Sequence, residues 1–210
     1  YSFIAYAHQE QIYPVYEAAI IRELEMICAV LPCEKLAIQW DVATEMSLFE
    51  KVYPTPVGKP WDVLTGRLAA LGDQVPDGVE LGYHLCYGSM NNRHWKEPDD
   101  LGMCVAVANV LADTVKRQID FLHMPVPVNR SDSGYFSPLE QLALADGTEL
   151  FLGLVHDVDG LAGNRARMDA AARVRADFGI GSECGWGRRS AEDARIIMQL
   201  HARLADSSSA

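Results

Sequence analysis

The stretch Val79-Glu80-Leu81-Gly82-Tyr83-His84-Leu85-Cys86-Tyr87-Gly88-Ser89 predicts a short buried strand. Its residues are apolar, small or β-forming at most positions, and Gly88 and Ser89 close it. Side chains alternate between the two faces of a strand, so His84 and Cys86 point the same way. Their Cα atoms are expected about 6.6 Å apart, at a rise of about 3.3 Å per residue. An imidazole nitrogen and a thiolate with this spacing can bind one metal ion.

The composition indicates a globular domain with a substantial core. The chain has 210 residues, of which 49% are hydrophobic and 22% charged. A net charge of −11 argues against nucleic acid or an anionic membrane surface as the main partner. The longest apolar stretch, residues 101–112, contains Asn109 and is too short to span a bilayer. Five irregularly spaced cysteines predict reduced thiols in a cytoplasmic protein, not a disulfide framework.

Strand and helix patterns alternate along the whole chain. Strands are expected at residues 36–41, 79–86, 119–124, 150–157 and 179–184. Helices are expected at residues 1–31, 61–71, 101–117 and 137–145, within 161–178, and from 191 to about 204 after a Ser190 cap. Residues 53–60 and 90–100 read as loops. Residues 1–205 are predicted to form a single domain, with a flexible tail at 206–210.

Five strand–helix repeats predict a parallel sheet with helical crossovers. A Gly-rich phosphate turn after an early strand, typical of an open doubly wound sheet, is not visible in the sequence. The pattern therefore favours an α/β fold of the (β/α)8 TIM-barrel type. Five strands do not close an eight-stranded barrel, so the chain is expected to cover about the last five β/α units. The three other strands are expected to precede Tyr1.

Polar residues occupy the carboxyl ends of the expected strands, where a barrel gathers its functional residues. They are Asp41, His84 with Cys86, His123, His156 with Asp157 and Asp159, and Glu183 with Cys184. Five such ends converging on one mouth indicate a functional site more strongly than any single motif.

These motifs resemble the C-terminal barrel of cobalamin-independent methionine synthase, in the superfamily that includes uroporphyrinogen decarboxylase. The resemblance covers nearly the whole chain and is carried, in order, by Ile38-Gln39-Trp40-Asp41, His84-Leu85-Cys86-Tyr87, Val155-His156-Asp157-Val158-Asp159 and Glu183-Cys184-Gly185. It implies a zinc-dependent enzyme of methionine biosynthesis, which transfers a methyl or related alkyl group to a small-molecule thiol.

The resemblance also implies the metal ligands. His84, Cys86 and Cys184 match three zinc ligands of the family. The fourth is a Glu on the following strand, and this chain has no Glu in the matching stretch 120–125. His123 is the expected substitute, because imidazole suits zinc.

Other site residues follow from the same comparison. Asp41, with Gln39 on the same strand, matches the substrate-binding strand, although Val42-Ala43 replaces the family's Glu-Pro. Asp159 stands where the family has a proton-transferring His, and His156 lies nearby. The family's donor is a folate with a polyglutamate tail, for which the basic candidates are Arg93, Lys96, Arg130, Arg188 and Arg189.

Several of these residues have structural alternatives. Asp157 and Asp159 are either a substrate-binding or acid–base pair, or caps of the following helix. His123 is either a ligand or a hydrogen-bonded core histidine. Glu183 could instead pair with Arg188 or Arg189. The remaining cysteines are expected to be packing residues: Cys28, Cys33 and Cys104.

Two other functions stay open. One is a lyase or decarboxylase of the same superfamily, acting on a carboxylated small molecule through Asp41, His156 and Asp159. The other is a non-catalytic partial barrel, whose edge strands would be exposed. A homo-oligomer is compatible with each of these functions.

Overall fold

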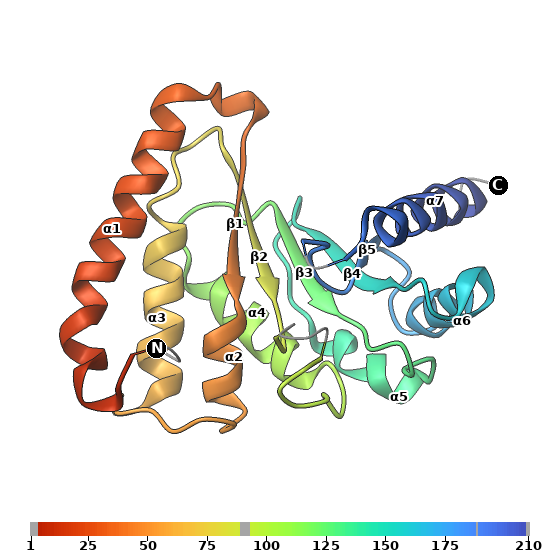
Figure 1. Ribbon diagram of the computed structural model, residues 1–210, viewed down its shortest axis with the longest axis horizontal. Helices are drawn as coiled ribbons and strands as arrows, with labels where there is room; N and C mark the ends of the chain where they lie inside the picture. Colours follow the sequence, from red (N-terminus) through yellow and green to blue (C-terminus); the bar gives the residue numbers. More distant parts are fainter. Residues whose placement is uncertain (1–3, 89–92, 188, 209–210) are drawn as a thin grey trace.

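A parallel five-stranded sheet forms the centre of the molecule (Figure 1), in a computed structural model that describes residues 4–88, 93–187 and 189–208. The strand order is β1-β2-β3-β4-β5, so strands that are consecutive in sequence are neighbours in the sheet. The strands are β1 (Ala37–Val42), β2 (Glu80–Leu85), β3 (Phe121–Pro125), β4 (Glu149–Val155) and β5 (Gly179–Ser182). Each crossover therefore connects adjacent parallel strands.

Helices precede, connect and follow the strands (Figure 1). Before β1 lie η1 (Tyr6–His8), α1 (Gln9–Val30) and η2 (Cys33–Lys35), and between β1 and β2 lie α2 (Ala43–Phe49) and α3 (Pro60–Gly72). The later elements are α4 (Gly102–Thr114), α5 (Ser133–Phe136), η4 (Ser137–Gln141), α6 (Gly160–Ala172) and α7 (Ala191–Ser208).

The two faces of the sheet carry different side chains, as strand alternation requires. One face is apolar and buried in the core, with Leu81, Tyr83, Leu122 and Leu152 at or near zero exposure. The opposite face lines a cavity of about 680 Å³, whose walls include Gln39, His84, Phe121, His123 and Phe151. Sequential parallel strands that alternate with helices are consistent with consecutive units of a β/α barrel.

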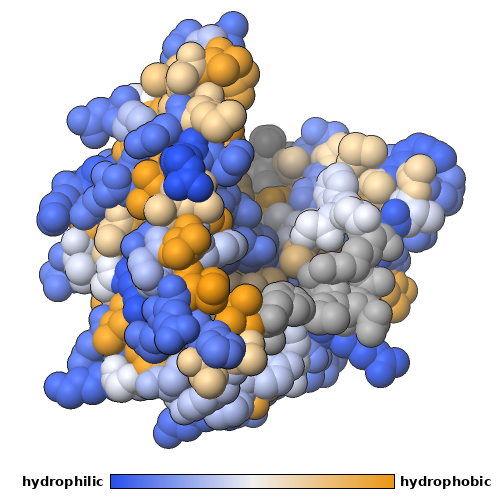
Figure 2. Space-filling view, turned by 60° about the vertical axis from the view of Figure 1, so that its left-hand side comes forward, coloured by the Kyte–Doolittle hydropathy of each residue, from blue (hydrophilic) through white to orange (hydrophobic). Residues whose placement is uncertain are grey.

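The sheet is not closed within the described residues. There, β1 and β5 each pair with one strand, so each has one free edge. A cavity beside β1 is lined by Trp40 and Asp41 of this strand and by residues of α1. On α1, apolar side chains such as Ile12, Ile27 and Val30 are exposed (Figure 2).

All five predicted strands are confirmed, with ends within two residues of those expected. The Ser190 cap is confirmed too, because Ser190 Oγ accepts from the Asp193 N–H at 3.1 Å. The helix predicted at residues 137–145 is confirmed only in its first part, as the 3-10 helix η4 (Ser137–Gln141), because Leu142 is extended. The preceding helix α5 was not predicted. The short helix α2 was not predicted.

Several expected boundaries differ from those of the structure. The helix α4 ends at Thr114, three residues before the predicted end, and α7 continues to Ser208, into the predicted tail. Residues 1–3, 89–92 and 209–210, which include parts of the predicted first helix, loop and tail, lie outside the described residues. In the part of the chain that is described, every helix is too short or too polar to cross a membrane.

Candidate metal centre

The carboxyl ends of β2 and β5 bring three potential metal ligands together. His84 lies in β2, Cys86 follows the end of β2, and Cys184 follows β5 by two residues. One ligand atom of each residue lies within 4.8 Å of the other two. The sulfur atoms of Cys86 and Cys184 are 3.9 Å apart, although 98 positions separate these residues in the sequence. The predicted convergence of these three side chains is confirmed, and the group could hold a metal ion.

Burial shapes the chemistry of the thiol pair. Cys86 is 4% exposed. The hydrogen bond with Cys184 raises the pKa of the Cys86 thiol well above its usual range, and burial and the charge of Asp41 add to this effect. The Gly88 N–H donates to Cys86 Sγ at 3.3 Å and opposes the increase. A cation bound between the two sulfur atoms would stabilise the thiolate form of the buried Cys86, which its surroundings otherwise disfavour.

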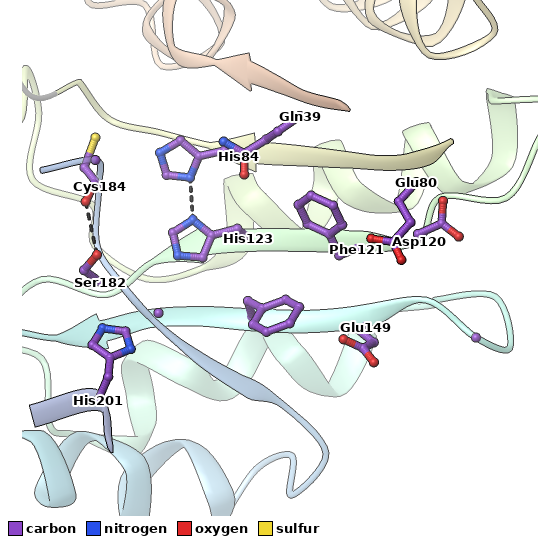
Figure 3. Close-up of a pocket in the computed structure, with 14 residues that line it drawn as sticks. Gln39, Glu80, His84, Asp120, Phe121, His123, Glu149, Ser182, Cys184 and His201 are labelled. Carbon is purple, nitrogen blue, oxygen red and sulfur yellow. Dashed lines mark hydrogen bonds between the residues drawn. The ribbon is translucent and has the colours of Figure 1, made fainter. Parts of the chain in front are cut away.

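His123 contacts His84 directly (Figure 3). The two rings stack with centroids 4.6 Å apart, and their Nδ1 atoms form a hydrogen bond. His84 is 4% exposed, and its Nε2 is buried without a hydrogen-bond partner in the described structure. A buried nitrogen without a partner is costly in a protein interior, and a metal ion would satisfy it.

Two glycines make room for the His123 ring. A Cβ atom at Gly153 or at Gly181 would lie 2.9 Å from His123 Nε2. Burial, and then the neighbouring His84, lower the pKa of His123 to about 3, so this ring is neutral at ordinary pH. The three-residue group does not include His123, and its role as fourth ligand stays a prediction. The His123 ring stacks on that of His84.

The predicted substrate-binding residues of β1 lie next to this group. Asp41 is paired in register with His84, and Gln39 lines the cavity. Desolvation raises the pKa of the Asp41 carboxyl, while the charge of His84 acts in the opposite direction. The β1 carboxylate is exposed, lies next to His84 in the sheet, and lines the cavity beside α1.

The end of β4 has a different character, because its acidic groups are bound to arginines. Asp159 accepts two hydrogen bonds from the buried Arg167, at 2.6 and 2.8 Å, and these lower the pKa of the carboxyl. Asp159 occupies the N-cap position of α6, but its side chain forms no cap hydrogen bond. Asp157 is paired with Arg189 at 2.9 Å.

His156, at the same strand end, is held by the protein as well. Its Nε2 hydrogen-bonds to the carbonyl oxygen of Val126 at 2.7 Å, and its backbone N–H donates to Asn164 Oδ1 at 2.8 Å. Burial lowers the pKa of the His156 imidazole. The structure places none of the β4 candidates, Asp157 included, in the three-residue ligand group.

Sequence reasoning missed His94, which lies in the loop between β2 and α4. His94 Nε2 is 3.2 Å from Glu183 Oε1, so Glu183 pairs with a histidine and not with Arg189. Arg188, its other expected partner, lies outside the described residues. Of the basic residues proposed for a polyglutamate tail, three are paired with carboxylates: Lys96, Arg130 and Arg189.

No protein-family model matches the chain, and no curated protein matches it. Its function is therefore inferred from the side chains that converge at the strand ends.

Proposed function

We propose that the protein is a zinc-dependent enzyme, similar to methionine synthase, that transfers a methyl or related alkyl group to a small-molecule thiol. The observation that carries the proposal is the convergence of His84, Cys86 and Cys184. Two thiolates and an imidazole suit zinc, which binds sulfur and nitrogen ligands in tetrahedral sites. When bound, zinc would lower the pKa of an incoming thiol and present it as a thiolate nucleophile.

The protein side chains would bind and orient the acceptor. Three protein ligands leave the fourth position of a tetrahedral site for a substrate. The cavity beside Cys184 provides space for the rest of the acceptor. Gln39, which lines this cavity, and Asp41, which is paired in register with His84, would bind its polar end. A carboxylate in this position favours an acceptor that carries an ammonium group.

His123 would act through His84 and not as the fourth ligand. A neutral imidazole in contact with a ligating histidine fixes the orientation and protonation of that ligand. The glycines at positions 153 and 181 leave the space that this arrangement needs.

The fold proposal accompanies the functional one. The five β/α units are proposed to be the later units of a (β/α)8 barrel. Support comes from the sequential parallel order, the free edges of β1 and β5, and the exposed apolar residues of α1 beside β1. The same free edges support a second candidate, a partial barrel without catalytic activity. The lyase alternative has less support, because the β4 residues on which it depends, His156 and Asp159, are held by hydrogen bonds to the protein.

The test is elemental analysis of protein purified without added zinc. Wild type and a Cys28→Ser/Cys33→Ser control are expected to contain about one zinc per chain, as a single tetrahedral site requires. The Cys86→Ser/Cys184→Ser variant is expected to contain none. Zinc retained by that variant, or a folded wild type without metal, would contradict the proposal.

A second assay separates the two enzyme functions. Alkyl transfer to a thiol is expected to stop when zinc is removed with a strong chelator and to return when zinc is restored. An activity that survives chelation but is lost in Asp41→Asn would instead support the lyase. Folded, zinc-loaded protein without activity towards any thiol would favour the partial barrel.

A further inference from the structure

Two adjacent loop residues, His94 and Trp95, contact the neighbours in sequence of both potential thiolate ligands. His94 Nε2 lies 3.2 Å from Glu183 Oε1, and Glu183 directly precedes Cys184. The Trp95 indole covers Gly88 so closely that a Cβ atom there would overlap the ring. Gly88 in turn donates its N–H to Cys86 Sγ at 3.3 Å. Each of the two sulfur-bearing loops is therefore contacted by one residue of this dipeptide, through one intermediate residue.

The His94 contact is an ion pair in a largely buried place. The His94 side chain is 10% exposed, and its Nδ1 is 3.2 Å from Glu97 Oε2. Burial by itself would lower the pKa of His94, but Glu183 and then Glu97 outweigh it and raise this pKa to about 9. A charged imidazole between two carboxylates attracts the partly buried Glu183 by charge, because within the described residues Glu183 Oε1 forms no hydrogen bond of good geometry. Glu97 is 69% exposed and contributes less.

The Trp95 contact constrains the backbone at Cys86. Gly88 has a φ of +86°, which a residue with a Cβ atom rarely adopts. The backbone N–H of Trp95 donates to the Tyr87 carbonyl at 2.9 Å. The indole ring of Trp95 meets the Tyr53 ring edge-on, with centroids 6.3 Å apart. The indole thus keeps Gly88 in the conformation that directs its N–H at the Cys86 sulfur.

We propose that His94 and Trp95 are positioning residues of the metal centre: His94 places Cys184 through Glu183, and Trp95 places Cys86 through Gly88. The inference rests on the proposed metal site and adds residues that touch neither the metal nor the substrate. Outer-shell residues of this kind change metal affinity by about 10- to 100-fold.

The experiment measures zinc affinity of the whole chain by competition with a chromophoric chelator. His94→Gln, Glu183→Gln and Trp95→Leu are each expected to weaken zinc binding by about tenfold or more. The matched control Glu97→Gln removes only the exposed partner of His94 and is expected to change affinity by about twofold or less. The His94→Gln/Glu183→Gln double variant is expected to be no weaker than either single variant, because both remove one interaction.

Cobalt(II) substitution distinguishes positioning from a loss of general stability. The sulfur-to-cobalt absorption band is expected to shift or weaken in His94→Gln and Trp95→Leu, at temperatures where circular dichroism shows both variants folded. If Trp95→Leu does not fold, Trp95→Phe keeps an aromatic ring over Gly88 and is expected to have an intermediate affinity. Wild-type affinity and spectrum in folded His94→Gln and Trp95 variants would overturn the proposal.

A separate measurement applies if wild type binds no metal, which would refute the proposed function. In the metal-free protein, iodoacetamide is expected to alkylate Cys184 faster in His94→Gln, and Cys86 faster in Trp95→Leu. Cys28, on α1, is the internal reference and is expected to react at the wild-type rate. Equal rates at Cys86 and Cys184 in wild type and variants would overturn the positioning roles themselves.

Discussion

The end of β4 and the ends of β2 and β5 carry similar residues but differ in how their polar groups are satisfied. At β4, Asp159 is bound by Arg167, and His156 by the Val126 carbonyl. At β2, His84 has a buried Nε2 without a hydrogen-bond partner in the described structure. Buried polar groups normally have partners, so the unsatisfied atom indicates a ligand and the satisfied ones indicate structure. Position at a strand end does not by itself identify a site.

The largest effect is expected at the β4 end, where Arg167→Met removes a side chain that is 1% exposed. Arg167 donates to Asp159 and to the carbonyls of Leu154 and Val128. Each carbonyl left without its hydrogen bond costs about 1–3 kcal/mol of unfolding free energy, and the Asp159 carboxylate, which is 33% exposed, adds less. Urea unfolding checks this value. The zinc content of the folded variant is expected to equal that of wild type. Loss of zinc would show that the β4 end also supports the metal centre at the ends of β2 and β5.

A smaller loss is expected for His156→Leu. The substitution leaves the buried Val126 carbonyl without its hydrogen bond, which costs about 1–3 kcal/mol. Thermal and urea unfolding measure the change. Zinc affinity is expected to stay at the wild-type value. A folded variant with weakened zinc binding would mean that His156 belongs to the metal centre.

A pH effect is expected from His123, whose folded-state pKa is lowered from 6.5 to about 3 by burial and by His84. Below pH 6.5 the unfolded chain binds a proton that the folded chain does not, so stability decreases as the pH falls. Between pH 6.5 and 5 the loss is about 1–2 kcal/mol. Urea unfolding of metal-free protein is expected to show a smaller loss in His123→Gln. His156 contributes in the same direction, so part of the slope remains. An identical slope would contradict the neutral, buried state of His123.

The smallest effect is expected for Gly181→Ala, which sharpens the role of the His123 ring. The new Cβ would lie 2.9 Å from His123 Nε2, so the ring must shift by a few tenths of an ångström. Zinc binding is expected to weaken by about threefold, with a stability loss of about 1 kcal/mol, the lower end of the cost of overpacking. The control is Gly185→Ala, since a Cβ atom at Gly185 meets no atom within 4 Å. Equal zinc affinities in the two variants would show that the ring does not support the site.

The strands were predictable because buried parallel strands are short apolar runs bounded by polar or glycine residues. The α2 helix was not, because Ala43 continues directly from β1 without a loop or a capping residue. The helix predicted at 137–145 rested on Ser137 and Pro138, which do begin η4, but it ends early because Leu142 is buried in an extended conformation. There, tertiary packing decided the local structure.

The core of the candidate site was predictable for a related reason. Parallel strands place their carboxyl ends at one edge, so His84, Cys86 and Cys184 were expected to meet. The contacts of His94 and Arg167 were not, because they depend on where long loops and long side chains run. The same limit applies to His123, whose position next to His84 was foreseeable but whose ring contact with His84 was not.

The sulfur–sulfur contact has a consequence for the folding of the chain. Cys86 and Cys184 are 98 positions apart, and three strands lie between them. A metal ion bound by both would act as a cross-link and restrict the conformational freedom of the unfolded segment. By analogy with a disulfide, closing a loop of about 100 residues lowers the entropy of the unfolded chain and stabilises the folded state by about 4.7 kcal/mol. Removal of the metal by a chelator would then lower the unfolding free energy of the whole segment from β2 to β5 as one cooperative unit, and not only loosen the strand ends around the metal site.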